Sequence, residues 1–162
     1  PAPQTLVDRL TEYVREDLPV LAITISSTMS GSFSTMCVAA REVEDQFQNA
    51  KIQVIDSLAY GPVITLLAIE ASKYREKGHS FEETVDYINK IKMRVHECGV
   101  LDDLFFLARK GRIGKAAAFM GNMIGIKPMA ELCKEVGIEL LNNHTSSEET
   151  ALSWLPALTA SL

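Results

Sequence analysis

Most of the residues that suggest chemistry in this chain lie in one short, hydroxyl-rich stretch. It reads Ser26-Ser27-Thr28-Met29-Ser30-Gly31-Ser32, and we call it the serine turn. Hydroxyls are rotatable hydrogen-bond donors, and Gly31 allows a ligand to approach the backbone closely. These residue types suit the binding of an anion. Capping of a helix by Ser30 or Ser32 explains the same residues, so both interpretations stay open here.

The flanking sequence places the serine turn at the end of a strand. The apolar run from Val20 to Ile25 predicts a strand that is buried on both faces, and Ser34 to Phe47 has the pattern of a helix. A turn between them lies at the carboxyl end of the strand, where α/β sheets bind their ligands. The first N–H groups of such a helix are unpaired and carry a partial positive charge, which strengthens the prediction of an anion site.

A second strand should end at the same edge of the sheet. Lys51 to Ile55 is a short β-rich run that ends in Asp56-Ser57. Because parallel strands finish at a common edge, Asp56 and Ser57 either border the crevice of the serine turn or cap a turn of their own. Both hypotheses stay open.

The order of the predicted elements favours an α/β fold. Helical patterns occur at residues 5–16, 34–47, 63–77, 80–91, 104–110 and 115–123. Ser80 and Glu83 have the spacing of a capping box at the start of one helix. A third strand is expected within residues 94–101. Strands that alternate with helices indicate a mainly parallel sheet with helices on both faces.

The pattern changes near residue 126. Apolar runs at residues 126–132 and 138–141 predict a β-hairpin, and residues 147–158 predict one more helix. A hairpin with little to pack on is only marginally stable. We therefore expect an α/β ligand-binding domain over residues 1–125, lacking its N-terminal strand, and the incomplete beginning of a second domain over residues 126–162.

The composition narrows the classes of function. The 162 residues carry a formal net charge of -5 and no block of Lys or Arg, which argues against binding nucleic acid. No apolar run is long enough to cross a bilayer. Cys37, Cys98 and Cys133 have no paired spacing, as expected in a reducing compartment. We expect a cytoplasmic protein that binds small molecules or other proteins.

Catalysis and metal binding have less support in the sequence. A histidine could act with a serine nucleophile, but the sequence has no Gly-x-Ser-x-Gly elbow, and surface positions explain the histidines. They are His79, His96 and His144. Asp102 and Asp103 could bind a metal, yet the start of a helix accounts for both. We therefore predict no catalytic residue and no metal site.

Four motifs, in order along the chain, resemble those of the DegV family of bacterial fatty acid-binding proteins. The family's Ile-Ser-Ser-x-Leu-Ser-Gly-Thr turn is similar to residues 25–32, and its Val-Ile-Asp-Ser strand end is similar to residues 54–57. Its Gly-Arg-Ile-x-Lys-Ala and Ile-Lys-Pro segments are similar to residues 111–116 and 126–128. The resemblance covers nearly the whole chain.

The resemblance implies a two-domain α/β protein that holds one long-chain fatty acid and is not itself an enzyme. The residues that match the family's carboxylate-binding turn are Ser26, Ser27, Ser30 and Gly31. Candidates for the edge of the pocket are Asp56, Ser57 and Arg112. No cofactor is implied beyond the bound fatty acid. Similar proteins are the binding subunit of a bacterial fatty-acid kinase, so a separate ATP-dependent kinase subunit is the expected partner.

The chain also departs from the family pattern. Lys110 stands where the family has a second glycine before Gly-Arg-Ile, and Val63 and Thr65 stand where it has glycines after Asp-Ser. The family's N-terminal strand and most of its second domain have no counterpart, so we expect a fragment of a DegV-like protein. Two alternatives stay open. One is a hydrolase with Ser27 or Ser30 as nucleophile, and the other is a module that binds a phosphorylated small molecule at the same turn.

Overall fold

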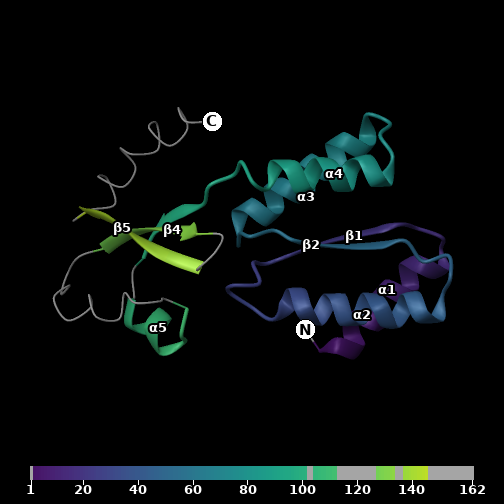
Figure 1. The fold of residues 1–162 in the computed structure, drawn as a ribbon, viewed down its shortest axis with the longest axis horizontal. Helices are drawn as coiled ribbons and strands as arrows, with labels where there is room; N and C mark the ends of the chain where they lie inside the picture. The colour runs from purple at the N-terminus through teal and green to yellow at the C-terminus, as the bar shows by residue number, and fades with distance from the viewer. Residues whose placement is uncertain (1, 102–103, 113–126, 134–136, 146–162) are drawn as a thin grey trace. The chain divides into compact units, whose positions relative to one another are not determined.

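The structure is a computed structural model that describes residues 2–101, 104–112, 127–133 and 137–145 (Figure 1). The chain divides into two compact units, Pro1–Val95 and His96–Leu162. Each unit contains its own β-sheet. Within the described ranges, no helix combines the length and apolar character needed to cross a membrane.

The first unit is a two-stranded parallel sheet with helices on both faces. Its elements are α1 (Pro3–Arg15), β1 (Val20–Thr24), α2 (Ser32–Gln46), β2 (Ile52–Asp56), α3 (Pro62–Glu76) and α4 (Phe81–Ile91). α1 and α2 lie on one side of the strands, and α3 and α4 on the other (Figure 1). Thr24 pairs with Asp56 at the end of the parallel register, so the two strands finish together. The predicted α/β fold with a parallel sheet is confirmed.

Buried side chains hold this sheet from both sides. α1 and α2 pack through residues spaced three or four apart, which places them on one helix face. These residues are Val7, Leu10, Val14, Ala39, Ala40 and Val43. Ile55 of β2, Leu67 of α3 and Ile88 of α4 are also fully buried. The ends of β1 and β2 are therefore fixed by packing as well as by pairing.

β1 is less buried than its apolar sequence predicts. Thr24 is its one buried residue, and the other four are partly exposed, so the prediction of burial on both faces is wrong for this chain. Among the described strands, β1 pairs with β2 alone. An open groove of about 740 Å³ borders β1 and α3, with Leu21, Ile23 and Ile64 among its lining residues.

The second unit contains an antiparallel sheet. Its described elements are β3 (Cys98–Val100), α5 (Leu104–Arg109), β4 (Lys127–Cys133) and β5 (Gly137–Thr145). The strand order is β3-β4-β5, and β4 and β5 form the predicted hairpin. The third predicted strand exists, but its place in the parallel sheet is wrong, because Cys98 pairs with Glu131 of β4 in antiparallel fashion. A strand of three residues carries too short a pattern to indicate its partner.

The division between the units falls at Val95 and His96, because β3 belongs to the sheet of the hairpin. The predicted domain boundary between residues 125 and 126 lies outside the described residues and stays a prediction. The helices predicted at residues 115–123 and 147–158 also lie outside them.

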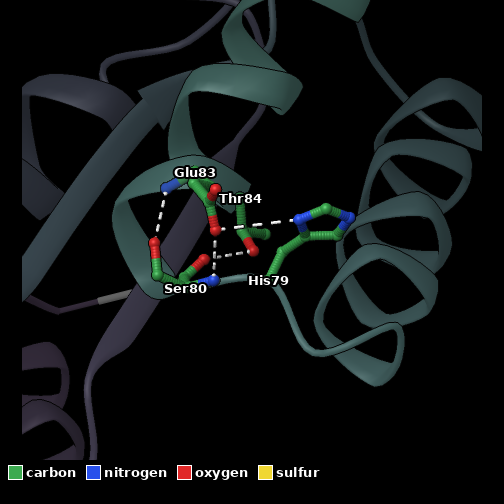
Figure 2. Close-up of polar contacts among 4 residues, drawn as sticks. All are labelled: His79, Ser80, Glu83 and Thr84. Carbon is green, nitrogen blue, oxygen red and sulfur yellow. Dashed lines mark hydrogen bonds and ion pairs between the residues drawn. The ribbon is translucent and has the colours of Figure 1, made fainter.

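The start of α4 is a capping box (Figure 2). Ser80 Oγ accepts a hydrogen bond from Glu83 N–H at 3.1 Å, and Glu83 Oε2 accepts one from Ser80 N–H at 2.7 Å. His79 Nδ1 lies 3.7 Å from Glu83 Oε2, and the His79 ring stacks on Tyr74 of α3 with 3.8 Å between centroids. The predicted box is confirmed, and it fixes the connection between α3 and α4.

Replacing Glu83 with glutamine is expected to lower the melting temperature near neutral pH but not in acid. The N–H of Ser80, and then its hydroxyl, lower the pKa of Glu83, so the folded state favours the carboxylate. The stabilisation of the folded state by this carboxylate is fully present above the pKa of glutamate in the unfolded chain, about 4.3. It is lost as the pH falls through the lower pKa that Glu83 has in the folded state. Thermal unfolding of wild type and Glu83→Gln over this pH range measures it. A difference in melting temperature that does not close in acid would contradict the prediction.

Candidate functional site

The serine turn connects β1 to α2, at the carboxyl end of the strand. β1 ends at Thr24, and Gly31 is the N-cap residue of α2. Gly31 has a φ of -71°, which any residue adopts, so its backbone does not require glycine. A Cβ added at Gly31 would meet no atom of the described residues within 4 Å beyond its chain neighbours. The glycine therefore leaves open space at the N-terminus of α2.

Several polar groups of the serine turn bond to one another. Ser26 Oγ and Thr28 Oγ1 are 2.8 Å apart, and Ser26 Oγ accepts the N–H of Thr28 at 3.3 Å. Ser30 Oγ lies 2.9 Å from Ser32 Oγ and accepts the N–H of Ser32 at 3.2 Å. The hydroxyls of Ser26 and Ser30 thus shape the turn. The Ser30 hydroxyl binds one N–H group at the start of α2, but the predicted alternative of helix capping by Ser30 or Ser32 is wrong, because Gly31 is the N-cap residue and no side chain of the described residues caps the helix.

Ser26 and Ser27 differ sharply in exposure. Ser26 is 0 % exposed, whereas Ser27 is exposed. No partner for the Ser27 hydroxyl is present in the described part of the chain, although the Ser27 N–H is bonded. Sequence reasoning treated the two serines alike, because neighbouring identical residues give no signal of which side chain is buried. Of the two hydroxyls, that of Ser27 is the accessible one.

The loop after β2 is bonded to the serine turn through the backbone. Ser57 N–H donates to the carbonyl of Thr24 at 3.1 Å, and Ser26 N–H donates to the carbonyl of Ala59 at 2.8 Å. Ser57 is 1 % exposed, and its hydroxyl donates to the carbonyl of Ala59 at 3.0 Å. The structure brings Asp56 and Ser57 next to the serine turn. That Asp56 and Ser57 border a ligand stays a prediction. The Ser57 side chain is buried, so its role in this loop is structural.

Asp56 bonds to both loops at once. Its carboxylate accepts the N–H of Ser27 at 3.2 Å and the N–H of Leu58 at 3.0 Å. Leu58 has a φ of 55°, a left-handed conformation that costs a residue with a side chain about 1–2 kcal/mol. The bond to Asp56 helps to hold Leu58 in this conformation and ties the serine turn to the same carboxylate.

Lys92 reaches this pair of loops from the end of α4. Its Nζ donates to the carbonyl of Asp56 at 2.9 Å, and the side chain is partly buried. Burial lowers the pKa of Lys92, while the attraction of Asp56 acts in the opposite direction. Sequence reasoning missed Lys92, because 36 residues separate it from Asp56 and a lysine at a helix end is ordinary.

The remaining predicted residues lie elsewhere. Arg112 belongs to the second unit, where its N–H donates to the carbonyl of Leu107 and its guanidinium contacts the carbonyl of Lys110. Its place at the edge of the pocket stays a prediction. Asp102 and Asp103 fall outside the described residues. Among those that are described, no group of three or more His, Cys, Asp and Glu residues could hold a metal ion.

Comparison with known proteins identifies the family. The family model described as "Uncharacterised protein, DegV family" matches residues 1–157. The chain belongs to the DegV family. A DegV domain-containing protein of Lactococcus lactis is 36% identical over 124 residues, which are 76% of this chain and 43% of that protein. The predicted membership of the DegV family is confirmed.

Solved DegV structures share the fold. A DegV family protein from Thermus thermophilus, described by its fatty acid binding, matches with a TM-score of 0.83 and 26% identity, covering 99% of this chain and 55% of that chain. The Streptococcus pneumoniae fatty acid kinase (Fak) B3 protein, solved loaded with linoleic acid, matches with a TM-score of 0.80 and 24% identity, covering 99% and 56%. This chain spans about half the length of these DegV relatives.

Alanine at Ser26 is expected to destabilise the fold far more than alanine at Ser27. The buried Ser26 hydroxyl accepts the N–H of Thr28, whereas the exposed Ser27 hydroxyl has no described partner. Removing a buried hydrogen-bond partner costs about 1–3 kcal/mol, while an exposed substitution usually changes stability by less than about 0.5 kcal/mol. Urea unfolding of the two single variants measures the difference. Equal losses would show that the Ser27 hydroxyl is also structural.

Proposed function

We propose that this chain belongs to a protein that binds a long-chain fatty acid and holds its carboxylate at the turn from Ser26 to Gly31. The Ser27 hydroxyl and the open N-terminus of α2 meet the carboxylate, while Ser26 and Ser30 keep the turn in shape. One observation carries the proposal: an exposed serine, Ser27, and a glycine with open space around it, Gly31, lie in one turn between the end of β1 and the start of α2. The fatty acid binding described for the Thermus thermophilus relative supports the choice of ligand.

The two parts of such a ligand contribute in different ways. Each charge-assisted hydrogen bond to the carboxylate contributes about 1.5–3 kcal/mol. Each buried CH₂ of the tail contributes about 0.8 kcal/mol, so a tail of more than a dozen carbons gives on the order of 10 kcal/mol in total. The tail therefore provides most of the affinity, and the serine turn fixes the orientation of the carboxylate.

We further propose that the whole protein presents this carboxylate to a separate ATP-dependent kinase subunit and has no catalytic residue of its own. The fold shared with the Streptococcus pneumoniae fatty acid kinase B3 protein supports this partner. Phosphoryl transfer depends on an attacking oxygen held in line, which is what an orienting turn supplies. Asp56 is proposed to lie at the edge of the pocket, and a cytoplasmic location remains our prediction.

Two other functions would use the same turn. A phosphorylated small molecule could meet the N–H groups at the start of α2 as a carboxylate does. A hydrolase would need a base beside Ser27, and His79 is engaged elsewhere by Tyr74 and Glu83. Membership in the DegV family favours the fatty acid over both alternatives.

The whole protein that contains this chain, purified from bacteria, is expected to carry about one long-chain fatty acid per molecule. A buried tail of this length dissociates slowly because the tail provides most of the affinity. Organic extraction followed by mass spectrometry measures it, and an unrelated protein purified in the same way is the control. An extract that holds only water-soluble phosphorylated compounds would contradict the proposal.

A further inference from the structure

An acidic side chain lies directly beside the proposed anion site. Both carboxylate oxygens of Asp56 face the N–H of Ser27, Oδ1 at 3.2 Å and Oδ2 at 3.3 Å. The Ser27 hydroxyl is the group proposed to meet the ligand. The carboxylates of Asp56 and of the ligand would thus contact adjacent groups of one residue, and two negative charges this close repel each other. A positive charge that offsets Asp56 therefore favours the binding of an anion here.

Lys92 is placed to supply that offset. Its ammonium group donates to the backbone carbonyl of Asp56 at 2.9 Å, which brings a positive charge to the residue that carries the carboxylate. Lys92 is partly buried, so solvent screens this charge less than it would on an open surface. Lys92 is the residue that follows α4, so it approaches the loops after β1 and β2 from outside both of them. A nearby cation partly cancels the field of Asp56 at Ser27.

We propose that Lys92 is the counter-charge that allows the serine turn to hold a carboxylate next to Asp56. Lys92 is a positioning residue that acts through Asp56, and the inference rests on the proposed function. Removing Lys92 leaves the charge of Asp56 without its offset, which weakens the binding of an anionic ligand. A ligand with the same tail and an uncharged head group loses nothing. Removing the charge of Asp56 as well makes Lys92 dispensable.

The test compares oleic acid with oleyl alcohol on the whole protein, using calorimetric titration of delipidated samples. Lys92→Met is expected to weaken binding of the acid about tenfold, which is the size of effect that one nearby charge produces. It is expected to weaken binding of the alcohol by less than about twofold. Lys90→Met is the matched control, because Lys90 is an exposed lysine in the last turn of α4, two residues before Lys92, and it is expected to change neither value. Lys92→Arg keeps the charge and is expected to keep the preference for the acid.

The double variant separates electrostatics from structure. In the Asp56→Asn background, Lys92→Met is expected to weaken binding of the acid by less than about twofold. A tenfold loss that persists there, or equal losses for acid and alcohol in Lys92→Met, would overturn the inference. Lys92→Gln replaces Lys92→Met if the latter does not fold. Wild-type protein that binds neither ligand would instead refute the proposed function, and with it this inference.

Discussion

The site depends on the hydrogen bonds that join the loop after β1 to the loop after β2. Thr24 and Asp56 end the parallel pairing side by side, and the ladder continues as Ser57 N–H donates to the carbonyl of Thr24. The carboxylate of Asp56 then ties Ser27 and Leu58 together. With its backbone held in this way, the serine turn can present a hydroxyl in a fixed direction. Loss of the pairing between the strands would remove the site even if every serine remained.

Much of the fold could be predicted from local sequence. The parallel pair of strands, its covering helices and the β4–β5 hairpin follow from apolar periodicity and turn residues, which report on nearby structure. The capping box of Ser80 and Glu83 is equally local. The place of the serine turn followed from the strand before it and the helix after it. The capping box and the hairpin depend on residues close together in the sequence, whereas β1 and β2 pair across 32 residues, and their parallel pairing followed from the alternation of strands with helices.

Other features that depend on distant contacts could not be predicted. β3 pairs with β4, about thirty residues along the chain, and nothing in three residues indicates that choice. The burial of Ser26 and the exposure of Ser27 follow from how the turn lies against Ala59. Lys92 contacts Asp56 only because α3 and α4 bring it back to the sheet. Identity and spacing of residues indicated the site, but tertiary packing decides the role of each side chain.

The central claim is that the serine turn holds the ligand's carboxylate through Ser27. The most direct measurement is the carbon NMR resonance of carboxyl-labelled oleic acid bound to the whole protein, in wild type and in Ser27→Ala. The account predicts one bound resonance, distinct from that of free acid, which moves in Ser27→Ala while the lipid stays bound, because the tail provides most of the affinity. A bound resonance that is the same in both proteins would contradict it.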